Sequence, residues 1–271
     1  ISIDIPTGLD ADTGSLDSAA IYADTTLTLG HPKRGLFLFP GAAATGLLEV
    51  IGIGLPVKEA IETNWSVITA KLVSERLPYR AKDSNKGSFG RALLIAGSPN
   101  YIGASILAST AAMRTGAGLV TLATSESVYK LASTQLIEPT FLPLKETNDG
   151  TIALESAVEI QENAKSYNTM LIGSGLSQSP EITEFLSQIL LSAQAPRIPK
   201  VLDADALNSL AKIPQWWERL KGPAVLTPHP GEIARLTGNT VAQIQLNRLE
   251  SALQAAQLWK QIVVLKGAYT V

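Results

Sequence analysis

The chain contains no cysteine, and only two of its 271 residues are histidine. The absence of cysteine excludes disulfide bonds, thiolate catalysis and thiolate metal sites. The shortage of histidine excludes a zinc site of the HExxH kind, because no pair of histidines has the required spacing. Apolar runs long enough to cross a bilayer and a signal-peptide pattern are also missing from the sequence. We therefore expect a cytoplasmic protein with no membrane partner.

Excess charge of one sign is missing too. Lysine and arginine number 22 against 24 aspartates and glutamates, which gives a formal net charge of -2. This balance gives no reason to expect a nucleic-acid partner, because such partners select for a basic surface. The hydrophobic fraction of 45% can fill sizeable cores, and the length predicts about two domains.

Both ends of the sequence have the pattern of β-strands. Residues 1–5 alternate apolar and polar side chains without a starting methionine, and residues 262–265 are apolar with only residues 266–271 after them. A strand at each end leads us to expect that the chain is a fragment of a longer protein.

From residue 91 onward, short apolar segments alternate with helical ones, which predicts a parallel α/β sheet with both faces covered. Strands are expected at residues 92–96, 118–123, 169–172, 201–202, 224–226 and 262–265. Helices are expected at residues 104–114, 127–133 and 181–193, the first of them buried because it is rich in small and aliphatic residues. Earlier strands are expected at residues 1–5, 25–29 and 47–53, with a change of domain between residues 57 and 85.

Polar and glycine residues follow the predicted strands at the point where each strand ends. The carboxyl ends of parallel strands meet at one edge of a sheet, where ligands bind. The sequence therefore predicts one site that gathers Gly97-Ser98, Gly173-Ser174-Gly175, Asp203, His229 and Lys266-Gly267.

Two of these strand ends have a functional and a structural interpretation. The glycines at 173 and 175 would let backbone N–H groups approach a phosphate, or they form an ordinary turn before a helix. Asp203 would contact a ligand or a hydrated cation, or it is a simple loop residue. Asp205 is expected to be a helix N-cap.

The remaining two strand ends carry a histidine and a lysine. His229 lies between Pro228 and Pro230, and it would donate a hydrogen bond to a substrate or phosphate, or cap the turn. Glu232, in the next helical turn, favours the helix dipole. Lys266 would pair with nucleotide phosphates as a point charge, or it is a solvated strand-end lysine.

The first segment has its own cluster of oxygen-bearing side chains. Asp4 and Thr7 are placed to face a ligand, and the Thr7 hydroxyl could join a ring of oxygens around a hard cation. Asp10 and Asp12 are expected to stabilise Asx-turns rather than to bind a metal.

These motifs together resemble the two-domain NAD(P)H-hydrate repair family. Residues 4–14 resemble a motif late in the epimerase domain, with Thr7 where the family usually has serine. From about Lys86 the chain resembles the dehydratase domain, and the motifs occur in family order at residues 86–90, 103–104, 116–120, 203–207, 227–232 and 266–268. The resemblance divides the chain into the end of an epimerase domain at 1–56, a linker at 57–85 and an incomplete dehydratase domain at 86–271.

The resemblance implies a fold, an activity and a set of contacts. The fold would be α/β, with a ribokinase-like parallel sheet preceded by the end of a Rossmann-like epimerase domain. The activity would be ADP- or ATP-dependent dehydration of the S epimer of hydrated NADH or NADPH, with Mg²⁺, and epimerisation of the two hydrates by the complete N-terminal domain. Substrate contacts would fall on Asp4, Ala104, Gly175 and His229. Nucleotide contacts would fall on Lys266, Gly267, Ala268, Tyr269 and Thr270, and potassium on Thr7.

The sequence departs from the family pattern in two places. Residues 173–177 replace the usual Gly-Pro-Gly-Leu-Gly loop, and Ser177 restricts backbone freedom where a glycine is usual. The family's Gly-Ser-Gly-Asp motif, with its catalytic aspartate, would lie beyond Val271. The resemblance therefore assigns no catalytic residue within the chain, and we expect negligible turnover by these 271 residues.

Two other functions stay open at this point. One is a small-molecule kinase of the same fold that acts on a vitamin-precursor alcohol. The other is a non-catalytic module for nucleotide binding or assembly, since related domains form homo-oligomers.

Overall fold

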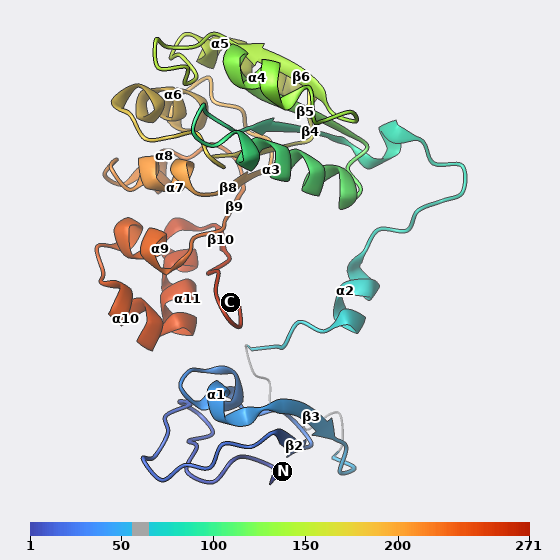
Figure 1. The fold of residues 1–271 in the computed structure, drawn as a ribbon, viewed down its shortest axis with the longest axis vertical. Helices are drawn as coiled ribbons and strands as arrows, with labels where there is room; N and C mark the ends of the chain where they lie inside the picture. The colour runs from blue at the N-terminus through green and yellow to red at the C-terminus, as the bar shows by residue number, and fades with distance from the viewer. Residues whose placement is uncertain (56–64) are drawn as a thin grey trace. The chain divides into compact units, whose positions relative to one another are not determined.

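Two parallel sheets organise the chain (Figure 1). The computed structural model describes residues 1–55 and 65–271. Internal contacts divide the chain into an N-terminal unit, Ile1–Arg80, and a C-terminal unit, Ala81–Val271, and each is described here by itself. The strand break expected at Pro56 and the first part of the expected linker, residues 57–64, lie outside the described residues.

The N-terminal unit holds three parallel strands in the order β1-β2-β3. They are β1 (Ser2–Ile3), β2 (Thr25–Leu29) and β3 (Leu47–Ile51). The described helical segments are η1 (Arg34–Phe37), α1 (Gly41–Thr45) and α2 (Ala70–Arg76). Strand β1 is shorter than expected because Asp4 adopts a φ of 69°, which leaves the extended region of the backbone. Helix α2 lies within the expected linker, and the Thr69 hydroxyl caps it by accepting the Leu72 N–H.

The C-terminal unit holds seven parallel strands in the order β10-β9-β8-β7-β4-β5-β6. They are β4 (Arg91–Ile95), β5 (Leu119–Ser125), β6 (Thr140–Leu144), β7 (Thr169–Ile172), β8 (Lys200–Leu202), β9 (Ala224–Leu226) and β10 (Ile262–Val263). The chain starts in the middle at β4, proceeds through β5 to β6, and then returns to β7 on the other side of β4. The sheet therefore has a topological switch point between β4 and β7, where ligands of open α/β sheets bind.

Helices cover both faces of this sheet (Figure 1). The helical segments of this unit are η3 (Lys86–Phe89), α3 (Ile102–Arg114), α4 (Glu126–Ala132), α5 (Ser156–Asn163), η4 (Ala164–Ser166), α6 (Pro180–Leu191), α7 (Asp205–Leu210), α8 (Trp216–Arg219), α9 (Pro230–Thr237), α10 (Val241–Leu246) and α11 (Arg248–Trp259). The C-terminal unit has two hydrophobic cores, and successive residues of β4 point alternately into one and the other. Leu93 and Ile95 belong to the larger core, and Ala92 and Leu94 belong to the smaller one.

The predicted α/β architecture is confirmed, with two corrections. Helix α3 begins and ends close to the predicted bounds, but it is not buried: Ser105 and Ser109 are its buried residues, and Leu107 is 73% exposed. Strand β6 was not predicted. Pro143 lies within it, and a proline is compatible with a strand here because β6 is an edge of the sheet.

Candidate active site at the strand ends

The residues that follow β8, β9 and β10 meet at the carboxyl edge of the large sheet. The Lys266 ammonium lies 2.5 Å from Asp203 Oδ1, and the Thr227 hydroxyl donates to the same oxygen at 2.8 Å. The Lys266 backbone N–H donates to the Pro228 carbonyl at 2.8 Å, which holds the two loops together. The structure thus brings together three of the strand ends that the sequence predicted to converge.

Helix α9 places a second carboxylate beside this lysine. Glu232 Oε2 lies 3.8 Å from Lys266 Nζ, and it also accepts the His229 backbone N–H at 2.7 Å. The Glu232 side chain is buried, whereas that of Lys266 is 40% exposed. One ammonium therefore faces two carboxylates and remains accessible from solvent.

His229 caps helix α9 and keeps one ring nitrogen for other contacts. Its Nδ1 accepts the Gly231 N–H at 3.0 Å, so the neutral ring carries its proton on Nε2. Nε2 lies 3.4 Å from Glu232 Oε1, and the ring is half exposed. The capping interpretation is therefore correct for Nδ1, and the Nε2 proton is the group with which His229 could contact a substrate.

The glycine loop after β7 lies at the switch point. The Gly97 N–H donates to the Ser174 carbonyl at 2.9 Å, which joins the ends of β4 and β7. Gly175 has a φ of 70°, and a Cβ at this position would lie 2.8 Å from the Ala104 Cβ. Ala104 and Gly175, both predicted substrate contacts, are therefore neighbours. Any side chain at 175 would collide with helix α3.

Asp205 does not cap helix α7 as predicted. The N-cap is Ala204, with a φ of 48°, and Asp205 is the first helical residue. Its carboxylate instead accepts the Ser177 N–H at 2.9 Å and the Gln178 amide at 3.1 Å. The Asp205 side chain therefore anchors the glycine loop, because the loop and α7 lie side by side at the strand ends.

The predicted nucleotide-binding loop, residues 266–270, is closed at its base. Leu265 and Val271 exchange backbone hydrogen bonds of 2.8 and 3.2 Å. Arg248, at the start of α11, donates to the Leu265 carbonyl at 3.1 Å and to the Lys266 carbonyl at 3.2 Å. Gly267 leaves room for this guanidinium, because a Cβ at residue 267 would lie 2.8 Å from Arg248 Nη2. Burial lowers the pKa of Arg248 from its ordinary value.

Sequence reasoning missed Arg248 and underestimated Glu232. Nothing in the spacing around residue 248 pointed to the loop, because the contact depends on how α11 packs beside β10. The interval from His229 to Glu232 has the spacing of a capping box, and this pattern could have predicted the reciprocal hydrogen bonds.

The N-terminal unit places Asp4 and Thr7 after β1. Asp4 Oδ1 accepts from the Lys33 ammonium, from the Leu29 N–H at 3.0 Å and from the Thr28 hydroxyl at 3.4 Å. The hydrogen bond from Lys33, followed by that from Leu29, lowers the pKa of Asp4. Thr7 is exposed, and its carbonyl accepts the Ile21 N–H at 3.0 Å. The partner Lys33 was not predicted.

Asp10 stabilises the turn that follows, as predicted. Its carboxylate accepts the Thr13 N–H and hydroxyl, each at 2.7 Å, and the Asp12 N–H at 3.1 Å. These hydrogen bonds, with that from the Thr13 N–H the strongest, lower the pKa of Asp10. Across the described ranges 1–55 and 65–271, no group of three or more His, Cys, Asp or Glu side chains could hold a metal ion.

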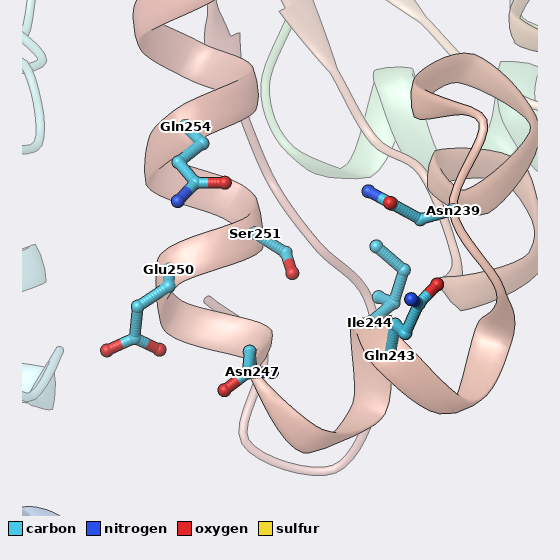
Figure 2. A pocket seen from close by; sticks show the side chains of 7 residues that line it. All are labelled: Asn239, Gln243, Ile244, Asn247, Glu250, Ser251 and Gln254. Atoms are coloured by element: carbon cyan, nitrogen blue, oxygen red, sulfur yellow. The ribbon is translucent and has the colours of Figure 1, made fainter.

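A polar hollow of about 380 Å³ lies between α10 and α11 (Figure 2). Its lining is rich in amide side chains, and its residues are Asn239, Gln243, Ile244, Asn247, Glu250, Ser251 and Gln254. None of the predicted site residues lines it.

Among the helices of the described residues, none is long and apolar enough to span a membrane.

Solved structures define the class of this fold. The ADP/ATP-dependent NAD(P)H-hydrate dehydratase of Bacillus subtilis, co-crystallised with ATP and Mg²⁺, has a TM-score of 0.61 and 37% identity over 74% of this chain and 66% of that one. A ribokinase-like superfamily protein of Enterococcus faecalis has a TM-score of 0.61 and 24% identity, over 74% of this chain and 65% of that one. The C-terminal unit therefore has the ribokinase-like α/β fold.

Comparisons of sequence identify the family. The family model described as NAD(P)H-hydrate dehydratase matches residues 92–271, and the one described as YjeF-related protein N-terminus matches residues 1–35. The chain is 40% identical to the bifunctional NAD(P)H-hydrate repair enzyme Nnr of Moorella thermoacetica and 37% identical to that of Thermofilum pendens, in each case over 100% of this chain and 51% of the relative. The chain belongs to the NAD(P)H-hydrate dehydratase family, and it spans about half the length of the curated relatives it matches. The family predicted from the sequence is thereby confirmed.

Proposed function

We propose that this chain provides the substrate and nucleotide contacts of an ADP- or ATP-dependent dehydratase that converts the S hydrate of NADH or NADPH back to the reduced nucleotide. The observation that carries the proposal is the position of Lys266. Its ammonium lies at the carboxyl edge of a ribokinase-like sheet, 40% exposed, beside a loop that Arg248 holds closed. A lysine in this position can pair with nucleotide phosphates.

The other strand ends provide contacts for the hydrate. Ala104 and Gly175 are neighbours at the switch point and have no large side chains, so a nicotinamide ring and ribose could approach the backbone closely there. His229 offers an Nε2 proton that can donate a hydrogen bond to a substrate oxygen. The terminal phosphoryl group of the nucleotide would pass to the hydroxyl of the hydrate, with loss of the hydroxyl proton and release of ADP from ATP or AMP from ADP. Phosphate, rather than hydroxide, would then leave together with a proton from the adjacent ring carbon, which forms the double bond of the reduced nucleotide. The chain's own residues would hold the two ligands together and exclude water from them.

The oxygen atoms at the strand ends are too few to bind a magnesium ion alone, but they fit one whose other ligands are the nucleotide phosphates and water. Mg²⁺ in nucleotide sites takes one or two carboxylates together with phosphate oxygens and water. Of the two carboxylates beside Lys266, Asp203 is the less buried and could contribute, and Lys266 and Thr227 already bond to it. A potassium ion at Thr7 remains a proposal. Its support is that the Thr7 side chain is exposed, so that its hydroxyl is accessible to a cation.

Several further features stay proposals. They are the domain bounds 1–56, 57–85 and 86–271, the epimerisation by the complete N-terminal domain with Asp4 as a substrate contact, the homo-oligomeric state and the cytoplasmic location. The bifunctional names of the relatives from Moorella thermoacetica and Thermofilum pendens support the epimerase assignment.

Calorimetric titration of the 271-residue chain with ADP and with ATP, each with Mg²⁺, tests the nucleotide site. We expect saturable binding that the Lys266→Met variant weakens. Hydrated NADH is then added, and recovery of NADH fluorescence reports dehydration. Binding that is indifferent to Lys266 would contradict the proposed nucleotide loop, and rapid recovery of NADH would overturn the expectation of negligible turnover.

A further inference from the structure

Glu232 is a buried carboxylate with more contacts than a helix cap requires. It is 4% exposed, and its Oε2 accepts the His229 backbone N–H at 2.7 Å as the reciprocal half of a capping box. A glutamine could accept the same hydrogen bond through its amide oxygen. The cap therefore explains an acceptor at this position, and it leaves the negative charge unexplained.

Helix α10 gives an internal comparison. Gln243 holds the equivalent third position of that helix, and its Oε1 accepts the Thr240 backbone N–H at 2.8 Å. A neutral amide thus completes a capping box in the same chain. Burial of a carboxylate costs free energy unless the charge is paired, so the charge of Glu232 has to be accounted for by its other contacts.

Those other contacts are the two predicted binding groups. Glu232 Oε2 lies 3.8 Å from Lys266 Nζ, and Oε1 lies 3.4 Å from His229 Nε2. Because His229 Nδ1 accepts the Gly231 N–H, Nε2 is the protonated nitrogen, and it lies near the carboxylate while half of the ring stays open to a substrate. A single buried side chain therefore contacts both the lysine proposed for the nucleotide and the histidine proposed for the hydrate.

The geometry points to Glu232 as a positioning residue that joins the two binding groups. This inference rests on the proposed function and deepens it. The Lys266 ammonium is hydrogen-bonded to Asp203 at 2.5 Å and lies 3.8 Å from Glu232, so the second carboxylate attracts it from another side and narrows the positions it can take. The same carboxylate limits rotation of the His229 ring. Glu232 thereby affects nucleotide affinity through Lys266, without contact with the nucleotide.

The substitution Glu232→Gln separates charge from capping. We expect ATP with Mg²⁺ to bind about tenfold more weakly in calorimetry, because a Lys266 ammonium that is no longer held in place loses part of its charged contact with the phosphates. The midpoint of thermal unfolding should stay unchanged, because the amide oxygen keeps the cap, whereas Glu232→Ala should lower that midpoint too. The matched control is Gln243→Glu, which changes charge at the same cap position of α10 and should leave the affinity unchanged.

A double-mutant cycle tests whether Glu232 acts through Lys266. In a Lys266→Met background, Glu232→Gln should cause no further loss of ATP affinity. Independent losses that add would overturn the inference, because a merely structural defect would weaken both backgrounds alike.

A measurement without ligand distinguishes this inference from the proposed function. In protein with ¹³C-labelled lysine, the Lys266 ε-methylene NMR signal should shift in Glu232→Gln and stay in place in Gln243→Glu. A Lys266 signal that does not move would overturn the positioning role, whether or not nucleotide binds. Failure of the unmodified chain to bind ADP or ATP, with the expected NMR shift present, would instead count against the proposed nucleotide site alone and support the positioning of Lys266.

Discussion

Each of the two units has an aspartate just past a parallel strand and a lysine that pairs with it, but the two lysines differ in their remaining contacts. In the N-terminal unit, the Lys33 ammonium donates to Asp4, to the Thr28 hydroxyl at 3.3 Å and to the Leu29 carbonyl at 3.0 Å. An ammonium has three protons to donate, and these three acceptors use them all. Lys33 therefore holds the end of β2 against the end of β1.

In the C-terminal unit, the Lys266 ammonium has one close hydrogen bond, to Asp203, and lies 3.8 Å from the second carboxylate of Glu232. Protons of this ammonium are therefore available to an incoming acceptor, and a phosphate is the acceptor that a lysine favours at such a position. The comparison shows that two strand-end Asp–Lys pairs can differ in how many protons the ammonium has left to donate.

A third lysine extends the comparison and gives the largest expected effect. Lys200 is 1% exposed, and its ammonium donates to three carbonyls, those of Pro196 at 3.2 Å, Ile198 at 2.8 Å and Lys221 at 2.5 Å. Burial lowers the pKa of Lys200 to about 8 from 10.5. Between about pH 8 and pH 10.5 the unfolded chain therefore binds more protons than the folded chain, and stability rises with pH.

We expect Lys200 to add about 3 kcal/mol to the free energy of unfolding over this interval, relative to a Lys200→Met variant. Urea unfolding of both proteins from pH 7.5 to about pH 10.5 measures the difference, and the variant corrects for all other titrating groups. Parallel pH profiles would show that the three carbonyls hold the charged form well enough to cancel the cost of burial.

The second prediction directly tests the difference between Lys33 and Lys266. Lys266→Met should weaken the binding of ATP with Mg²⁺ about 100-fold, because a charged contact to phosphate is lost. Lys33→Met removes an ammonium whose three protons already have acceptors, so it should change this affinity less than about twofold. Calorimetry on both variants decides the matter, and equal losses would show that saturation of the ammonium is not the relevant difference.

A smaller effect is expected from Arg248, which holds the backbone on which Lys266 sits. Arg248→Lys keeps the charge but cannot reach the Leu265 and Lys266 carbonyls and the Gln245 amide together, as the planar guanidinium does. ATP affinity should fall about tenfold, in line with the loss of one or two charge-assisted hydrogen bonds. Arg219, an exposed residue of α8, provides the control, because Arg219→Lys changes no contact of the loop and should leave the affinity unchanged. An unaltered affinity in Arg248→Lys would mean that the loop holds its shape through the exchange between Leu265 and Val271.

Much of the fold was predictable because its determinants are local. Buried parallel strands are short apolar runs, and the expected bounds at residues 169–172 and 224–226 are those of β7 and β9. Strand β6 was missed because Pro143 argues against a strand, and the sequence alone does not show that β6 is an edge. The exposure of α3 was missed for a related reason: small and aliphatic residues favour burial, but what covers a helix depends on tertiary packing.

The site was predictable where it depends on strand order and not where it depends on side-chain pairing. The convergence of Asp203 and Lys266 follows from the rule that parallel strands end at one edge. Their ion pair spans 63 positions and has no local pattern. Asp205 shows the limit most clearly, because a residue with a strong preference for N-caps instead bonds to Ser177 in the preceding loop.

That loop supplies the prediction with the smallest effect. Ser177 has a φ of 72°, a conformation that glycine adopts freely and that costs other residues about 1 kcal/mol. Ser177→Gly keeps the backbone N–H that Asp205 accepts, so it should stabilise the protein by about 0.5 kcal/mol after the greater freedom of glycine in the unfolded chain is subtracted. The same substitution at Ser179 is the control. Its φ is -130° and its hydroxyl caps α6 by accepting the Ile182 N–H at 3.1 Å, so Ser179→Gly should destabilise by a few tenths of a kcal/mol. Chemical unfolding of both variants should therefore give shifts of opposite sign, and shifts of the same sign would show that backbone strain at residue 177 does not govern the stability of this loop.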